Sequence, residues 1–91
     1  MPEWQLFDPE WLVALIHAQE PNPVLEAEVA KCTRAIKESD AYFHFVDPAE
    51  QTGYEFDHNV ALLDREHGMV VLDVWRDGRV GGVEFPDRVK A

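Results

Sequence analysis

Hydrophobic and polar residues alternate most regularly near the C-terminal end of the chain, in residues 69–85, MVVLDVWRDGRVGGVEF. This period of two predicts a pair of short strands. Asp77-Gly78 between them is typical of a two-residue hairpin turn whose central residues adopt positive φ. Such a turn places Trp75 opposite Val80, and one face of the hairpin then carries an unbroken apolar set: Val70, Leu72, Val74, Val83 and Phe85.

Two helices are expected before the strands, in residues 1–40. Asp8 is a good N-cap, Pro9 suits the first helical position, and the helix then buries one face made of Trp11, Leu12, Leu15 and Ile16. Pro21-Asn22-Pro23 ends this helix and begins a second, which runs to about Ser39. Its apolar stripe has helical spacing and consists of Leu25, Val29, Cys32 and Ile36.

The period changes to that of strands at Ala41. Residues 41–46, AYFHFV, and residues 55–63 predict two strands that precede the hairpin. An odd-numbered turn at residues 64–68 sets Val60 and Leu62, rather than Ala61 and Leu63, on the core face beside Val70. The expected fold is a single α+β domain over residues 1–91. Two N-terminal helices pack on one face of a four-stranded antiparallel meander (41–85), which is followed by a polar tail (86–91).

The other face of this sheet is half apolar and half charged, which suits an interface. The candidate interface residues are Leu63, Val71, Asp73, Trp75, Val80 and Glu84. A homodimer through this face is one way to cover it. The alternative is that the aromatic N-terminal arm folds over it. Trp4 and Trp11 either cover one end of the core or anchor a protein partner, in whose interfaces Trp is enriched.

The formal net charge of −10 on 91 residues is unevenly distributed. Residues 1–30 hold six acidic residues, residues 41–64 hold five, and neither segment contains Lys or Arg. Such a surface repels nucleic acid and anionic lipid and attracts basic proteins. No apolar run approaches the ~20 residues needed to span a bilayer, and no export signal is visible. The single Cys32 fits a reducing cytoplasm, so we expect a cytoplasmic protein.

Motifs for chemistry are weak. Asp73 and Glu84 form a carboxylate pair, in which one residue can act as acid and the other as base. Such pairs more often simply keep one face of a sheet hydrated. His44, Asp57 and His58 could meet across two neighbouring strands and bind a metal, although no metal-binding spacing is present. Gly81-Gly82 lies within a strand and does not precede a helix, so it suits the close approach of another backbone or of the Trp75 ring and not the binding of a phosphate. The sequence therefore favours binding without catalysis and without a cofactor.

The hairpin also resembles a small bacterial family, domain of unknown function 2283. The matching residues are Val71, Leu72, Asp73, Asp77, Gly78, Arg79, Val80, Gly82, Val83 and Glu84. The match covers about residues 41–85, and residues 1–40 depart from the family. Its members have no assigned activity and resemble companions of small toxin genes, which implies an antitoxin-like or accessory binding role.

The leading hypothesis is a non-enzymatic protein-binding module of the antitoxin or immunity type, whose acidic surface covers a basic partner. One alternative is a small enzyme or metal-binding protein that uses the acidic and His residues of the sheet face. Another is a nucleic-acid mimic, which needs acidic residues in regular rows along the surface.

Overall fold

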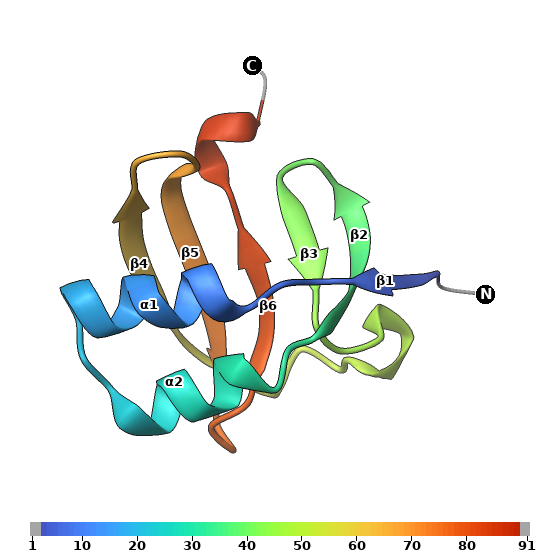
Figure 1. Cartoon of the computed structure of the whole chain (residues 1–91). Coiled ribbons are helices and arrows are strands. Elements are labelled where there is room, and N and C mark those ends of the chain that lie inside the picture. The colour runs from blue at the N-terminus through green and yellow to red at the C-terminus, as the bar shows by residue number, and fades with distance from the viewer. Residues whose placement is uncertain (1–2, 90–91) are drawn as a thin grey trace.

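The computed structural model describes residues 3–89, which form two helices and one six-stranded antiparallel sheet (Figure 1). The helices are α1 (Glu10–Gln19) and α2 (Pro23–Ala30). The strands are β1 (Trp4–Leu6), β2 (Arg34–Ser39), β3 (Tyr42–His44), β4 (Phe56–Asp64), β5 (Gly68–Trp75) and β6 (Val80–Glu84). The α+β class and the antiparallel sheet are confirmed, but the sheet has six strands instead of four.

α2 begins at the predicted residue, whereas α1 begins at Glu10, one residue later than predicted, with Pro9 at the N-cap position. Asp8 accepts a hydrogen bond from the backbone N–H of Glu10 (3.0 Å) at the start of α1. Asn22 caps α2 by accepting from the backbone N–H of Leu25 (3.1 Å), and Pro23 is the first helical residue. These side chains satisfy N–H groups that have no partner within their helix.

The expected continuation of the second helix to Ser39 is wrong, because α2 ends at Ala30. Residues 34–39 form β2, which pairs with β1 on one side and β3 on the other. Leu25 and Val29 are buried as expected, whereas Ile36 lies in a strand. As a strand, β2 provides main-chain hydrogen-bond partners for both β1 and β3. The stability gained from this pairing outweighs the helical spacing of the apolar stripe.

The strand order is β1-β2-β3-β6-β5-β4, so the expected meander is also wrong. β3 lies beside β6, and residues 45–55 carry the chain from β3 to β4 at the far edge of the sheet (Figure 1). Between β4 and β5 the expected register is confirmed, because Val60 pairs with Leu72 and Leu62 with Val70.

The hairpin register is confirmed only away from the turn. Val71 lies opposite Glu84 and Asp73 opposite Gly82, but a bulge then places Val74, not Trp75, opposite Val80. The backbone N–H of Gly78 donates to the carbonyl of Trp75 (3.0 Å), and Gly78 alone has positive φ in this turn (+92°). A wider turn with one left-handed glycine therefore replaces the expected two-residue turn.

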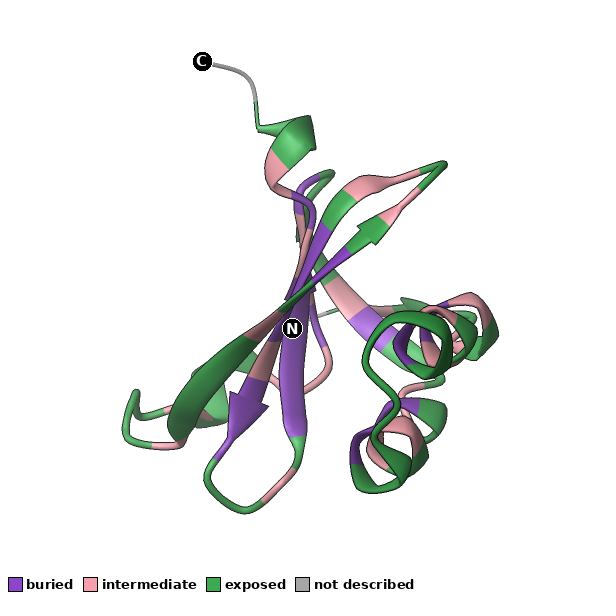
Figure 2. Ribbon diagram, turned by 90° about the vertical axis from the view of Figure 1, so that its left-hand side faces the viewer, coloured by how far each residue is buried: buried purple, intermediate pink, exposed green. Residues whose placement is uncertain are grey.

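One hydrophobic core lies between the helices and the sheet. Leu12, Ile16 and Val29 are fully buried against Phe85, which follows β6, and against the strand residues Leu62, Val70, Leu72, Val74, Val80 and Val83. Figure 2 shows both helices on one side of the sheet, with the buried segments concentrated in the strands. The helices thus leave the opposite side of the sheet uncovered.

The expected polar tail begins with a short 3₁₀ helix (Pro86–Arg88), and residues 90–91 lie outside the described range. Within residues 3–89, no helix combines the length and the apolar character needed to cross a membrane.

Candidate functional site

The outer face is the side of the sheet opposite the helices. Two rows of residues cross β4, β5, β6 and β3 in register: Asn59, Asp73, Gly82 and His44 in one row, and Ala61, Val71, Glu84 and Tyr42 in the next. Leu72 and Val83 alternate with these residues and belong to the helix-side core, so the two rows point away from the helices.

Tyr42 and Asp73 are joined across this face. The Tyr42 hydroxyl donates a hydrogen bond to Oδ2 of Asp73 and reaches it over Gly82 of the strand between them. A Cβ at Gly82 would lie 2.7 Å from the Tyr42 hydroxyl and 2.8 Å from the carbonyl oxygen of Phe43. Gly82 therefore allows β3 to approach β6 and allows Tyr42 to reach Asp73, in line with the expected role of the paired glycines.

Burial, followed by the hydrogen bond to Asp73, raises the pKa of Tyr42 well above its ordinary value. The negative charges of Asp73, Glu38 and Glu84 raise this pKa further. Tyr42 thus holds its proton firmly and acts as a hydrogen-bond donor to Asp73. A phenol in this state is a poor acid–base catalyst near neutral pH.

His44 is the buried polar residue of the outer face, with 8% of its surface exposed. Its Nε2 lies 3.0 Å from Oε1 of Glu38, and its ring centroid lies 4.6 Å from that of Tyr42. Its Nδ1 has no hydrogen-bond partner among residues 3–89. Glu38, Tyr42, His44, Asp73 and Glu84 therefore form one polar cluster, whose carboxylates are well placed to accept hydrogen bonds from a cationic group.

The predicted interface residues do not form one exposed apolar patch. Trp75 and Val71 are both buried. Trp75 lies across Gly81, where a Cβ would come within 2.1 Å of its Nε1. Val80 was expected beside Trp75, but the hairpin bulge turns it to the helix side, where it joins the core. Leu63 is exposed (67%), and Asp73 and Glu84 are half-buried on the outer face.

The two tryptophans proposed as partner anchors pack within the chain. Trp11 stacks on His67 with ring centroids 4.3 Å apart and also contacts Phe85, so it covers one end of the core. Trp4 is half-buried, and the guanidinium of Arg34 lies 5.3 Å from its ring centroid. An anchoring role for either residue stays a prediction.

His44, Asp57 and His58, which could have met across two neighbouring strands, are not brought together. His44 is on β3 and His58 is on β4, and the strand order places β6 and β5 between them. Asp57 does contact His58, with Oδ2 2.7 Å from Nδ1, but His44 is paired with Glu38 instead. Within the described residues, no three His, Cys, Asp or Glu side chains are grouped closely enough to hold a metal ion.

Cys32 has the inert character expected of a partly buried thiol. Its Sγ lies 3.5 Å from the carbonyl oxygen of Glu28, and burial together with the charge of Glu28 raises its pKa to about 11. Very little thiolate is then present at neutral pH, so Cys32 is poorly suited to nucleophilic catalysis.

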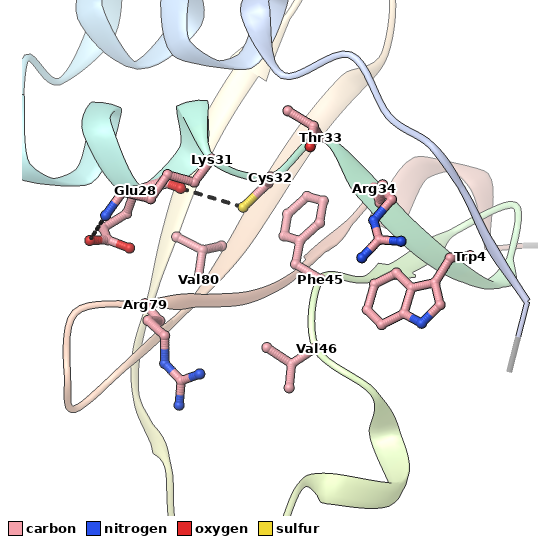
Figure 3. Close-up of a pocket in the computed structure, with 10 residues that line it drawn as sticks. All are labelled: Trp4, Glu28, Lys31, Cys32, Thr33, Arg34, Phe45, Val46, Arg79 and Val80. Atoms are coloured by element: carbon pink, nitrogen blue, oxygen red, sulfur yellow. Dashed lines mark hydrogen bonds and ion pairs between the residues drawn. The ribbon is translucent and has the colours of Figure 1, made fainter.

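Positive charge gathers at an open hollow of about 340 Å³ at one end of the sheet (Figure 3). Lys31, Arg34 and Arg79 contribute to its lining, and Phe45 and Val46 lie between the two arginines. Lys31 is paired with Glu28 (3.1 Å) and Arg79 with Asp77 (2.8 Å). Strands β3, β4, β5 and β6 carry no Lys or Arg on the outer face. The basic residues around the hollow are thus separated from the carboxylates on these strands.

Sequence reasoning missed Glu38 and Tyr42 as members of the outer-face cluster. Glu38 was assigned to a helix, and Tyr42 was placed on a strand that was not expected beside β6. The available signal was Gly81-Gly82 opposite Asp73, since glycine within a strand marks a close approach by another group.

Comparison with protein-family models, curated proteins and solved structures finds no match to this chain. The resemblance of the hairpin to domain of unknown function 2283 stays a prediction.

Proposed function

We propose that the protein is a non-enzymatic protein-binding module of the antitoxin or immunity type, whose outer face binds a basic segment of a partner protein. One observation carries the proposal. The helices cover only one face of the sheet. The uncovered face presents the carboxylates of Glu38, Asp73 and Glu84, and its positions on β3, β4, β5 and β6 carry no Lys or Arg.

The setting of these carboxylates favours a cationic ligand. Asp73 and Glu84 are half-buried, where an attraction to an incoming charge is screened less than at a fully exposed site. Tyr42 holds Asp73 in a defined orientation through its hydroxyl. A guanidinium group, with its planar set of donors, suits acceptors that are fixed in this way.

The net charge of −10 supports the same partner class. A strongly acidic surface accelerates encounter with basic proteins and disfavours nucleic acid. The buried positions of Trp75 and Val71 also weaken the basis for a homodimer through this face, because its apolar residues are already covered within the chain. A second copy would bring like charges together there.

Capture from the source cell tests the proposal when it is combined with matched variants. The full chain is immobilised, proteins are bound at low salt, and each captured protein is identified and its Kd is measured. We expect Glu38→Gln with Glu84→Gln to raise the Kd by at least about tenfold and to reduce its dependence on salt.

The control is Glu10→Gln with Glu20→Gln, which removes the same charge from exposed positions at the two ends of α1. This variant is expected to bind the partner nearly as well as the unmodified chain. The absence of any captured basic protein, or equal weakening by both pairs of substitutions, would contradict the proposal.

A further inference from the structure

β4 forms one edge of the sheet, and its main chain is held at one end by a side chain of α1. The backbone N–H of Leu63 donates to Oε1 of Gln19 (2.9 Å), and the Gln19 side-chain amide donates to the carbonyl oxygen of Leu63. The main-chain groups of Leu63 therefore point away from β5. In an antiparallel pair these groups alternate along the strand, so those of Ala61 and Asn59 also point outward.

The outward groups of Asn59 and Ala61 have no hydrogen-bond partner within residues 3–89. A groove of about 690 Å³ runs beside them, between β4 and the residues that connect α1 to α2. Gln19, Glu20, Pro21 and Asn22 line its far side. The edge is thus open to a further strand.

Proteins usually protect a long edge strand with Lys, Pro or charged side chains. Residues 58–63, HNVALL, contain no Lys, Arg, Asp, Glu or Pro. At one end of β4, a bulge at Asp57 ends the regular pairing. At the other end, Gln19 occupies the outward main-chain groups of Leu63. Asn59 and Ala61 are therefore the two ladder positions that remain open.

We infer that this edge binds a second copy of the chain by antiparallel pairing of β4 with β4 about a twofold axis at Val60. This register places Asn59 opposite Ala61 of the second copy and satisfies the open N–H and C=O groups of both residues in both copies. It leaves the Gln19–Leu63 bonds in place and needs no rearrangement of the bulge.

Charge supports a second copy as the occupant. Residues 58–62 carry no Asp, Glu, Lys or Arg, so the paired segments bring no like charges together in a chain of net charge −10. A basic segment is attracted instead to the carboxylates of the outer face, on another surface. With the twofold axis perpendicular to the sheet, the outer faces of both copies lie on the same side, and both remain open.

Sedimentation equilibrium of the full chain tests the inference between about 10 µM and about 1 mM. We expect the mass to rise toward that of a dimer over this range. We also expect the amide hydrogens of Asn59 and Ala61 to exchange more slowly as the concentration increases. A monomeric mass throughout the range would overturn the inference.

Charge substitutions test the register. Asn59→Asp with Ala61→Asp places acids opposite acids and should weaken dimerisation at least about tenfold. Asn59→Lys with Ala61→Asp, and the reverse pair Asn59→Asp with Ala61→Lys, place opposite charges across the axis and should restore the dimer. Failure of both charge-swapped variants to dimerise would overturn the register.

Two controls separate dimerisation from folding and from net charge. Thermal unfolding identifies variants that lose the fold, which matters because Asn59 neighbours Asp73 within its own sheet. Gln5→Asp with Leu6→Asp adds the same charge at the opposite edge strand, and it should leave the dimer intact. Equal loss of dimer in this control would overturn the assignment to β4.

Discussion

Tyr42 fixes the position of a half-buried carboxylate on the outer face, because its hydroxyl group donates a hydrogen bond to Asp73. Tyr42→Phe removes the hydroxyl donor, so Asp73 loses this hydrogen bond. We expect the free energy of unfolding near pH 8 to fall by about 1–2 kcal/mol. Tyr54→Phe, at an exposed position, is the matched control and should have almost no effect.

The same residue predicts a dependence of stability on pH. The pKa of Tyr42 is raised in the folded protein, mainly by burial, so folding favours the protonated phenol. Its contribution is complete below the ordinary tyrosine pKa of about 10 and decreases as the pH rises above that value. The free energy of unfolding, measured between about pH 8 and 11.5, should therefore decrease more steeply with pH in the unmodified chain than in Tyr42→Phe. Parallel curves for the two proteins would contradict this.

Residue patterns predicted much of the core but little of the outer-face cluster. Val60 and Leu62 were correctly assigned to the core face because a strand has a period of two and one face must be buried. The contact between Tyr42 and Asp73 depends on strands far apart in sequence, and strand alternation gives no information about which strands pair. The pattern of residues along the chain thus predicted which side chains are buried better than it predicted which side chains contact each other.

At the scale of elements, the β5–β6 hairpin depends on two glycines for different reasons. Gly78 has φ of +92°, and an added Cβ would meet no atom within 4 Å. Gly81 lies under the Trp75 ring, where a Cβ would overlap Nε1. We expect Gly78→Ala to cost about 1 kcal/mol through backbone strain and Gly81→Ala to cost about 1–3 kcal/mol through steric overlap.

A double-mutant cycle separates these two causes. Trp75→Leu removes the ring and should reduce the cost of Gly81→Ala, while the cost of Gly78→Ala should stay unchanged. The measurement is chemical unfolding of each single and double variant. Independent, additive costs for Trp75→Leu and Gly81→Ala would show that the ring does not depend on this glycine.

The elements themselves were predictable where local signals are strong. Asn22-Pro23 marked the start of α2, and the apolar alternation marked β5 and β6. The end of α2 was missed because Leu25, Val29, Cys32 and Ile36 keep helical spacing across a boundary at Ala30. The strand order was missed because the pairing of β3 with β6 joins segments about 40 residues apart, which loop length alone does not determine.

At the scale of the whole molecule, the helices and the charges give the sheet two unlike faces. One face holds the core beneath α1 and α2, and the other carries carboxylates and has no Lys or Arg on β3, β4, β5 or β6. The basic residues Lys31, Arg34 and Arg79 lie instead around the hollow at one end of the sheet. This separation is the property that makes the outer face the proposed binding surface.

Hydrogen–deuterium exchange of the full chain, with and without a captured basic partner, tests this claim most directly. The proposal predicts added protection in β2, β3, β5 and β6, which carry the residues of the outer-face cluster, and loss of that protection as salt is raised. The exchange of α1 and α2 should change little. Protection confined to the helices, with β2, β3, β5 and β6 unchanged, would contradict the proposed binding surface.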